Sequence, residues 1–161
     1  MAETDRMLVR AADSAAMLGY WDLTDTLVDG IDAMRLAGPK YLPQFPAELN
    51  DNYKFRLAHT TVMTNIFADI VESLSVKPFE KETALVGTDV PQELIDFSND
   101  VDGSGNNLSV FAANHFYNAV KSGIDWLFVD YPSVSDEIVT LADAKASNVR
   151  PFWTRILGRN V

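Results

Sequence analysis

The chain has 161 residues, 47% of them hydrophobic and 22% charged, a composition that fits one globular domain and excludes a wholly disordered chain. It contains no cysteine, which excludes disulfide scaffolds, iron–sulfur clusters and cysteine nucleophiles. Because there are only two histidines, His59 and His115, we do not expect a histidine-rich metal site. No apolar run reaches the roughly 18 residues that a membrane-spanning helix needs, so we expect no membrane partner.

Charge is distributed unevenly along the chain. The formal net charge is −10, yet every Asp and Glu lies at or before Asp143, and residues 144–161 carry four cations and no acid. A protein this acidic over residues 1–143 would repel DNA phosphates over most of its surface. We interpret the basic tail as a partner for acids on the same or an adjacent subunit, with a contact to nucleic acid as the alternative.

The first half of the chain predicts two long helices. Residues 1–20 are interpreted as an N-terminal arm or a short helix, and an apolar stripe at spacings of three and four predicts a helix from Trp21 to Leu36, stopped by Gly38. An ordered loop with two prolines follows at residues 41–46. The pattern then predicts a second helix over 51–74, apolar on several sides and therefore buried on several sides.

The second half mixes short helices with extended segments. We expect edge strands or an extended loop over 75–88, helical turns over 91–97, and a helix over 108–122 that Asn106 or Asn107 caps and Gly123 ends. Residues 124–131 form the best strand in the sequence, with two apolar faces that suit a central strand. A short helix over 135–146 and an extended segment over 149–153 complete the prediction. The fold class is therefore α+β, mainly helical with a small β-sheet.

One loop has the beginning of a calcium-binding pattern. Asp100, Asp102 and Ser104 occupy the first, third and fifth places of an EF-hand loop, and glycine occupies the sixth. The twelfth place should be a glutamate, but it is Phe111. We therefore favour a turn that caps the next helix, and keep a divalent-cation site as the alternative.

The sequence offers no clear catalytic group. It lacks a phosphate-binding glycine loop, a dinucleotide-binding glycine motif and a zinc-protease motif, and His115 has no nucleophile elbow beside it. We interpret His115 and His59 as hydrogen-bonded core or interface residues. No catalytic residue and no cofactor is expected. The excess apolar helix faces instead favour a protein that associates with copies of itself.

Several segments, taken in order, resemble the N-terminal part of tailed-phage portal proteins. The resemblance spans about Trp21 to Trp153 and depends on the order and spacing of its segments. They are Trp21 with the helix to Asp29-Gly30; Met34-Arg35-x-Ala37-Gly38 before Tyr41-Leu42-Pro43; Tyr53-x-x-Arg56-Leu57; Asn65 before Ile70-Val71; Asp102-Gly103-x-Gly105-Asn106-x-Leu108 with Phe111; Gly123-Ile124 leading to Val129-Asp130-Tyr131-Pro132; and Arg150-Pro151-Phe152-Trp153.

The resemblance implies a structural protein of the virion and not an enzyme. Portals are ring homo-oligomers, usually of twelve subunits, at one capsid vertex. Double-stranded DNA passes through the ring without specific binding, and the ring docks terminase, capsid and neck proteins. By this resemblance residues 21–161 form a wing-like α+β module of a protein assembled in the host cytoplasm, and the chain is expected to be truncated before the stem, clip and crown.

The resemblance and the aromatic residues of the chain together suggest a set of contact residues. The residues expected to contact neighbouring copies or partners are Trp21, Tyr41, Phe45, Tyr53, Arg56, Trp126, Arg150, Phe152 and Trp153. Two other functions stay open at this point. One is a small metal-assisted hydrolase that uses Asp100, Asp102 and His115, and the other is an accessory phage adaptor or scaffold protein that binds a portal.

Overall fold

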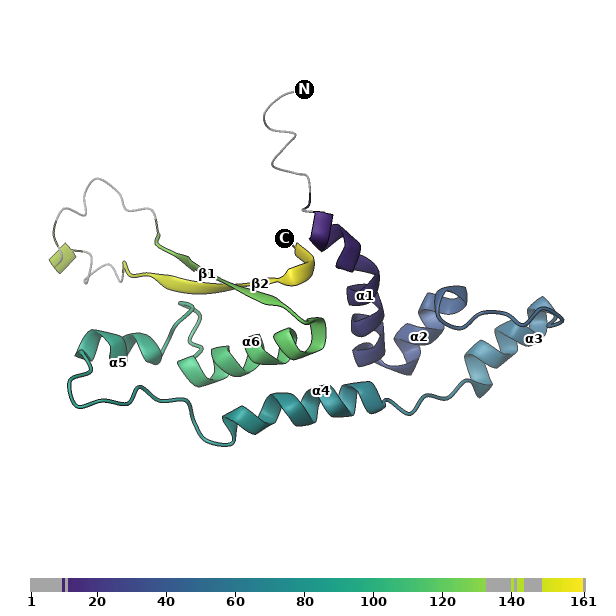
Figure 1. Ribbon diagram of the computed structural model, residues 1–161, viewed down its shortest axis with the longest axis horizontal. Helices are drawn as coiled ribbons and strands as arrows, with labels where there is room; N and C mark the ends of the chain where they lie inside the picture. Colours follow the sequence, from purple (N-terminus) through teal and green to yellow (C-terminus); the bar gives the residue numbers. More distant parts are fainter. Residues whose placement is uncertain (1–9, 11, 133–139, 141, 144–148, 161) are drawn as a thin grey trace, which may run out of the picture. The chain divides into compact units, whose positions relative to one another are not determined.

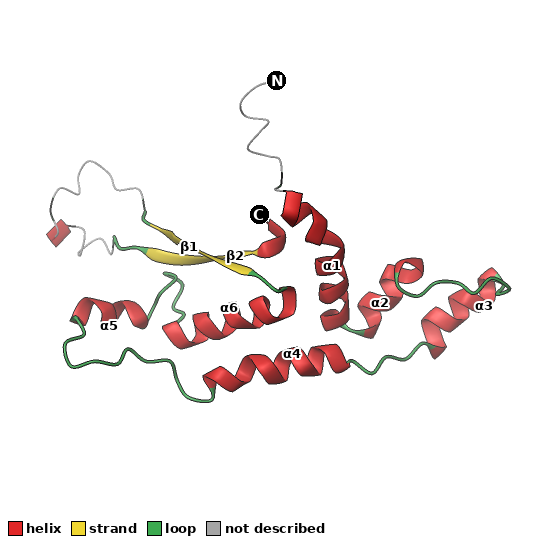
Figure 2. Ribbon diagram, viewed as in Figure 1, coloured by secondary structure: helices red, strands yellow, loops and turns green. Residues whose placement is uncertain are grey.

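The computed structural model describes residues 10, 12–132, 140, 142–143 and 149–160. The chain divides into two units, one running up to Leu74 and one formed by Ser75–Asn160, and this division lies inside the single module expected for residues 21–161. Figures 1 and 2 show that the described elements are mostly helices, with one pair of antiparallel strands. The predicted fold class, α+β and mainly helical with a small sheet, is confirmed.

The first unit begins with two helices where the sequence predicted one. Helix α1 spans Ala12–Asp29 and so crosses the expected boundary of the arm at residue 20, and α2 spans Ile31–Ala37. Gly30 separates them with φ 86° and ψ −157°, a conformation that only glycine adopts without strain. The predicted helix from Trp21 to Leu36 is therefore wrong in its start and its continuity. Its predicted stop is confirmed, because α2 ends just before Gly38, at φ 53°.

The second predicted helix is also broken. Helix α3 spans Asn50–Phe55 and continues as a π-helical turn over Arg56–Thr60, and α4 begins only at Ile66 and ends at Val76. The hydroxyls of Thr60 and Thr61 donate to the Arg56 carbonyl at 3.2 and 2.9 Å, so this carbonyl is satisfied without a further α-helical turn.

Asn65 then starts a new helix. Its side-chain oxygen accepts a hydrogen bond from the Ala68 amide at 3.0 Å, which is the N-cap contact of α4. Its side-chain nitrogen donates to the Leu27 carbonyl in the last turn of α1 at 2.6 Å. One side chain thus serves the end of one helix and the beginning of another.

Few apolar side chains are buried among the described residues of the first unit. They are Trp21, Met34, Tyr53 and Val71. Large apolar side chains such as Leu36 and Val62 are 91% and 88% exposed. This unit therefore keeps much apolar surface open, and the expectation that the helix over 51–74 is buried on several sides is wrong for the side chains around Val62.

The second unit contains α5 over Gln92–Ser98, α6 over Leu108–Ser122 and two strands, β1 over Asp125–Asp130 and β2 over Phe152–Leu157. Short 3-10 turns cover Lys77–Phe79 and Gly158–Asn160, and residues 81–90 form a loop without strands. The expected turns over 91–97 and the helix over 108–122 are confirmed.

The ends of α6 follow the local sequence signals. The Asn107 side chain accepts a hydrogen bond from the Val110 amide at 2.9 Å, as an N-cap does. Gly123 follows the helix with φ 78°, the left-handed conformation that glycine favours. The chain then turns directly into β1, and in Figure 1 α6 runs alongside the strand pair.

The two strands form an antiparallel hairpin-like pair whose register aligns Asp125 with Leu157 and Asp130 with Phe152. The predicted strand over 124–131 is confirmed, but its predicted central place is wrong, because among the described residues the sheet has only two strands. The extended segment predicted over 149–153 continues through Leu157. The helix expected over 135–146 falls largely outside the described residues.

Aromatic rings pack the space between β2 and the helices of the second unit. Trp153 contacts Phe97 and Phe111 edge to face, with ring centroids 5.4 and 5.7 Å apart. Val101 is completely buried, and its carbonyl accepts a hydrogen bond from the Trp153 amide at 2.8 Å. Trp153 therefore fixes β2 both by its side chain and by its backbone.

Candidate functional site

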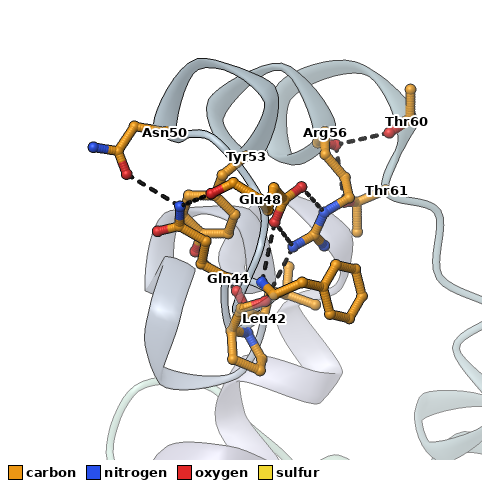
Figure 3. Close-up of polar contacts among 10 residues, drawn as sticks. Leu42, Gln44, Glu48, Asn50, Tyr53, Arg56, Thr60 and Thr61 are labelled. Atoms are coloured by element: carbon orange, nitrogen blue, oxygen red, sulfur yellow. Dashed lines mark hydrogen bonds and ion pairs between the residues drawn. The ribbon is translucent and has the colours of Figure 1, made fainter.

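The loop after α2 is fastened to α3 by a network around Arg56 (Figure 3). Arg56 binds both carboxylate oxygens of Glu48, through Nε at 2.8 Å and Nη2 at 2.9 Å, and donates to the Pro43 carbonyl at 3.0 Å. Its guanidinium also lies 4.6 Å from the ring centroid of Phe45. The bonded guanidinium holds the pKa of the Glu48 carboxyl below its usual value. Arg56 therefore organises its own loop.

Tyr53 belongs to the same network. Its hydroxyl donates to the Leu42 carbonyl at 2.8 Å, and the residue is only 8% exposed. Gln44 closes the loop by donating to Asn50 at 3.1 Å and to the Glu48 carbonyl at 2.6 Å. The network explains why a loop with two prolines keeps one shape.

The loop with the partial calcium pattern is filled by its own hydrogen bonds. Asp102 accepts from the Ser104 amide at 2.9 Å and from the Asn106 side chain at 2.6 Å. Asp100 accepts from the Gly105 amide at 2.9 Å and from Arg150 at 2.6 Å. Partial burial disfavours the charged form of Asp102, but the bonds from Asn106 and Ser104 outweigh it and lower the pKa of the carboxyl.

This geometry agrees with the favoured turn. The carboxylates of Asp100 and Asp102 accept hydrogen bonds from backbone amides, a neighbouring side-chain amide and a guanidinium. Across the part of the chain that the structure describes, no group of three His, Asp or Glu side chains is placed to hold a metal ion. Ser104 contributes its backbone amide to the turn.

A close contact between His115 and the buried carboxyl of Asp125 joins α6 to β1. Nδ1 of His115 lies 3.0 Å from Oδ2 of Asp125, whose side chain has no exposed surface, and Nε of Arg155 lies 3.8 Å from the same oxygen. Burial raises the pKa of the Asp125 carboxyl, and the nearby His115 and Arg155 offset only part of that effect. Within the described chain His115 hydrogen-bonds to no serine or threonine hydroxyl.

A polar hollow of about 290 Å³ lies beside β2. Its lining comes from the loop at 102–106, from α6 and from residues 153–155 of β2. The lining residues are Asp102, Ser104, Asn106, Phe111, Asn114, Trp153, Thr154 and Arg155. The rings of Phe111 and Trp153 contribute apolar surface, while the other six side chains are polar.

The structure divides the expected contact residues into three groups. Trp21, at 3% exposed, and Tyr53 lie in the core and offer a partner almost no surface, which corrects their expected role. Arg56, Arg150 and Trp153 are half-buried and engaged within the chain, and Tyr41 and Phe152 are half-buried. Phe45 and Trp126 are the exposed members, at 62% and 47%.

Sequence reasoning missed three features of the chain. The hollow, the pairing of His115 with Asp125 and the double role of Asn65 all depend on contacts between segments distant in the chain. For the pairing of His115 with Asp125, the signal available in the sequence was an Asp at the first position of an apolar strand.

Comparison with known proteins gives no assignment. No protein-family model matches the chain, and no curated protein matches it. No helix in the described part of the chain is both long enough and apolar enough to cross a membrane.

Proposed function

We propose that the chain is a structural subunit that assembles with copies of itself, as the wing-like part of a phage portal or head–tail connector. The observation that carries this proposal is the exposure of the apolar side chains of β1. Its four consecutive large apolar side chains, Trp126 to Val129, are 42–55% exposed on an edge strand. Such a strand is a site of pairing or aggregation unless something covers it.

The first unit supports the same proposal with further exposed apolar side chains. Phe45, Leu49, Phe55 and Val62 are 61–88% exposed. Exposed apolar side chains close together in the chain favour an interface with another protein surface. Lateral packing of identical subunits through these surfaces would close a ring if each contact is head to tail.

The charge of the chain fits passage of DNA without adhesion. Residues 1–143 carry a net charge of −14, which repels phosphate at short range and weakly at physiological salt beyond about 8 Å. In this proposal the protein performs no chemistry. Its role is geometric, at the capsid vertex through which DNA is packaged and ejected.

The structure gives a metal-assisted hydrolase no support. Asp100 and Asp102 bond within their loop, and His115 pairs with Asp125 instead of joining them. An accessory adaptor that binds a portal would use the same exposed surfaces, so only an assembly experiment separates it from a portal subunit.

The test is the oligomeric state of the chain, alone and within any longer protein that contains it. Light scattering coupled to size exclusion gives the mass, and negative-stain microscopy shows whether rings form. Rings in either context support the proposal. A strict monomer in the longer protein contradicts it, and binding only to rings made by another protein favours the adaptor.

A further inference from the structure

The hollow beside β2 has walls that contacts within the chain hold in place. In the loop at 102–106, amides of the same loop donate hydrogen bonds to the Asp102 carboxylate. Trp153 is held by the bond from its amide to the Val101 carbonyl and by the contact of its ring with Phe111. Because the walls are ordered before anything enters, a ligand does not have to order them when it binds, which favours affinity.

Several polar groups on these walls lack a partner among the described residues. The side-chain amide of Asn114 and the hydroxyl of Ser104 make no hydrogen bond there. The guanidinium of Arg155 makes none either, and the distance from its Nε to the Asp125 carboxylate is 3.8 Å. An amide or a hydroxyl both donates and accepts, and a guanidinium only donates. The hollow therefore offers a ligand hydrogen bonds of both kinds.

The backbone of β2 adds one more donor and one more acceptor. The Trp153 amide points away from β1, since it donates to the Val101 carbonyl. In an antiparallel pair such a residue directs both of its backbone groups outward, and outward residues alternate along the strand. The Trp153 carbonyl and the Arg155 amide therefore lie at the outer edge of β2, beside the hollow, and no described residue bonds to either.

The charge of the lining favours an uncharged ligand. Asp102 and Arg155 are its two charged side chains, so the formal charges cancel. Asp102 already accepts bonds from its own loop, and Arg155 lies near the buried carboxyl of Asp125. The hollow therefore presents neither the uncompensated positive charge that suits a phosphate nor the uncompensated cluster of carboxylates that suits a cation.

We propose that the hollow binds a neutral sugar, with one sugar ring inside it. Its volume of about 290 Å³ lies at the lower limit of the roughly 300–1,000 Å³ of ligand pockets, which suits a small ligand. The hydroxyls of a sugar both donate and accept, and the C–H faces of its ring are apolar enough to lie against the rings of Phe111 and Trp153. This inference goes beyond the proposed function and does not depend on it, because the lining comes from one copy of the chain.

A free amino acid is the nearest rival, because its two opposite charges could pair with Asp102 and Arg155. The rest of the lining favours the sugar. Four of the six polar side chains are uncharged, and hydroxyl groups are better partners for them than ionic groups. The two ligand classes give different results in the same titration.

Nuclear magnetic resonance titration of the full ¹⁵N-labelled chain tests the site. The probes are glucose, galactose, mannose and N-acetylglucosamine, with serine and glucose 6-phosphate as the zwitterionic and anionic comparisons. The reporters are the side-chain amide of Asn114, the indole N–H of Trp153 and the backbone amides of Ser104, Asn106 and Arg155. We expect saturable shifts at these reporters for at least one neutral sugar, with a millimolar Kd because one ring makes few contacts.

A matched pair of variants localises the binding. N114A should raise the Kd about fivefold or more, since one lost hydrogen bond corresponds to about 1 kcal/mol. N52A should change the Kd by less than about twofold, because Asn52 is likewise an exposed helical asparagine but does not line the hollow. Neither side chain makes a hydrogen bond within the described residues, so both variants should keep the fold, which their spectra show directly.

Three results would overturn the inference. They are the lack of a saturable shift with any of the four neutral sugars, tighter binding of serine or glucose 6-phosphate than of every neutral sugar, and equal affinities of N114A and N52A. None of these results concerns the oligomeric state, so the failure of the sugar site and the failure of the proposed function remain distinguishable.

Discussion

Replacing Asn65 with alanine tests the junction that divides the long predicted helix. The change removes two hydrogen bonds at once. The Ala68 amide loses its N-cap partner, and the Leu27 carbonyl loses the donor that lies 2.6 Å away. Both bonds lie within the first unit and are part-buried, so water replaces them only incompletely.

The cost follows from the two contacts. Loss of an N-cap typically costs about 1 kcal/mol, and a net intramolecular hydrogen bond contributes about 1 kcal/mol. N65A should therefore lower the free energy of unfolding by about 2 kcal/mol. N65S keeps an acceptor for the Ala68 amide but loses the donor to Leu27, so it should lose about half as much.

Urea denaturation followed by far-UV circular dichroism measures the difference. The matched control is N118A, since within the described residues the Asn118 side chain bonds only to the exposed Asn114 carbonyl one turn earlier in α6, and its loss should change stability by less than about 0.5 kcal/mol. If N65A is as stable as the parent chain, or if N65S and N65A are equally destabilised, the double cap does not stabilise the junction as argued.

Two further changes test the second unit. G123A should destabilise the chain by about 1 kcal/mol in urea denaturation, because φ is 78° at this position. The control is G19A inside α1, which should be neutral or stabilising. Equal effects of the two substitutions would contradict the argument. D125N tests the buried carboxyl. Since burial raises its folded pKa, the contribution of Asp125 to the free energy of unfolding, measured as the parent minus D125N, should fall as pH rises from the unfolded pKa, near 3.9, through the folded value, by at most about 1.4 kcal/mol per pH unit. Urea titrations of both proteins between pH 3 and 7 measure this difference, and pH profiles that run parallel would contradict the assignment.

Local signals predicted the elements whose ends are determined by neighbouring residues. Asn107 and Gly123 delimit α6 because a cap and a left-handed turn need only the adjoining backbone. The apolar character of residues 124–131 predicted β1 for the same reason. The two long helices were wrong because apolar spacing continues across Gly30 and Asn65, while the breaks depend on a glycine-only conformation and on a contact to Leu27.

The candidate site was less accessible to sequence reasoning. The loop at Asp100 and Asp102 could be predicted as a turn, because asparagine, glycine and aspartate bond to nearby amides. The partner of Asp100, however, is Arg150, fifty residues away, and His115 meets Asp125 only because Gly123 reverses the chain. Trp21 and Tyr53 were assigned to a surface because the aromatic character of a residue does not reveal on which side of a helix its neighbours lie.

The backbone bond between Trp153 and Val101 joins β2 to the loop that precedes α6. The ring of the same residue contacts Phe97 of α5 and Phe111 of α6. Because these contacts come from three separate segments, β2 cannot slide by one residue along β1 without losing all of them together.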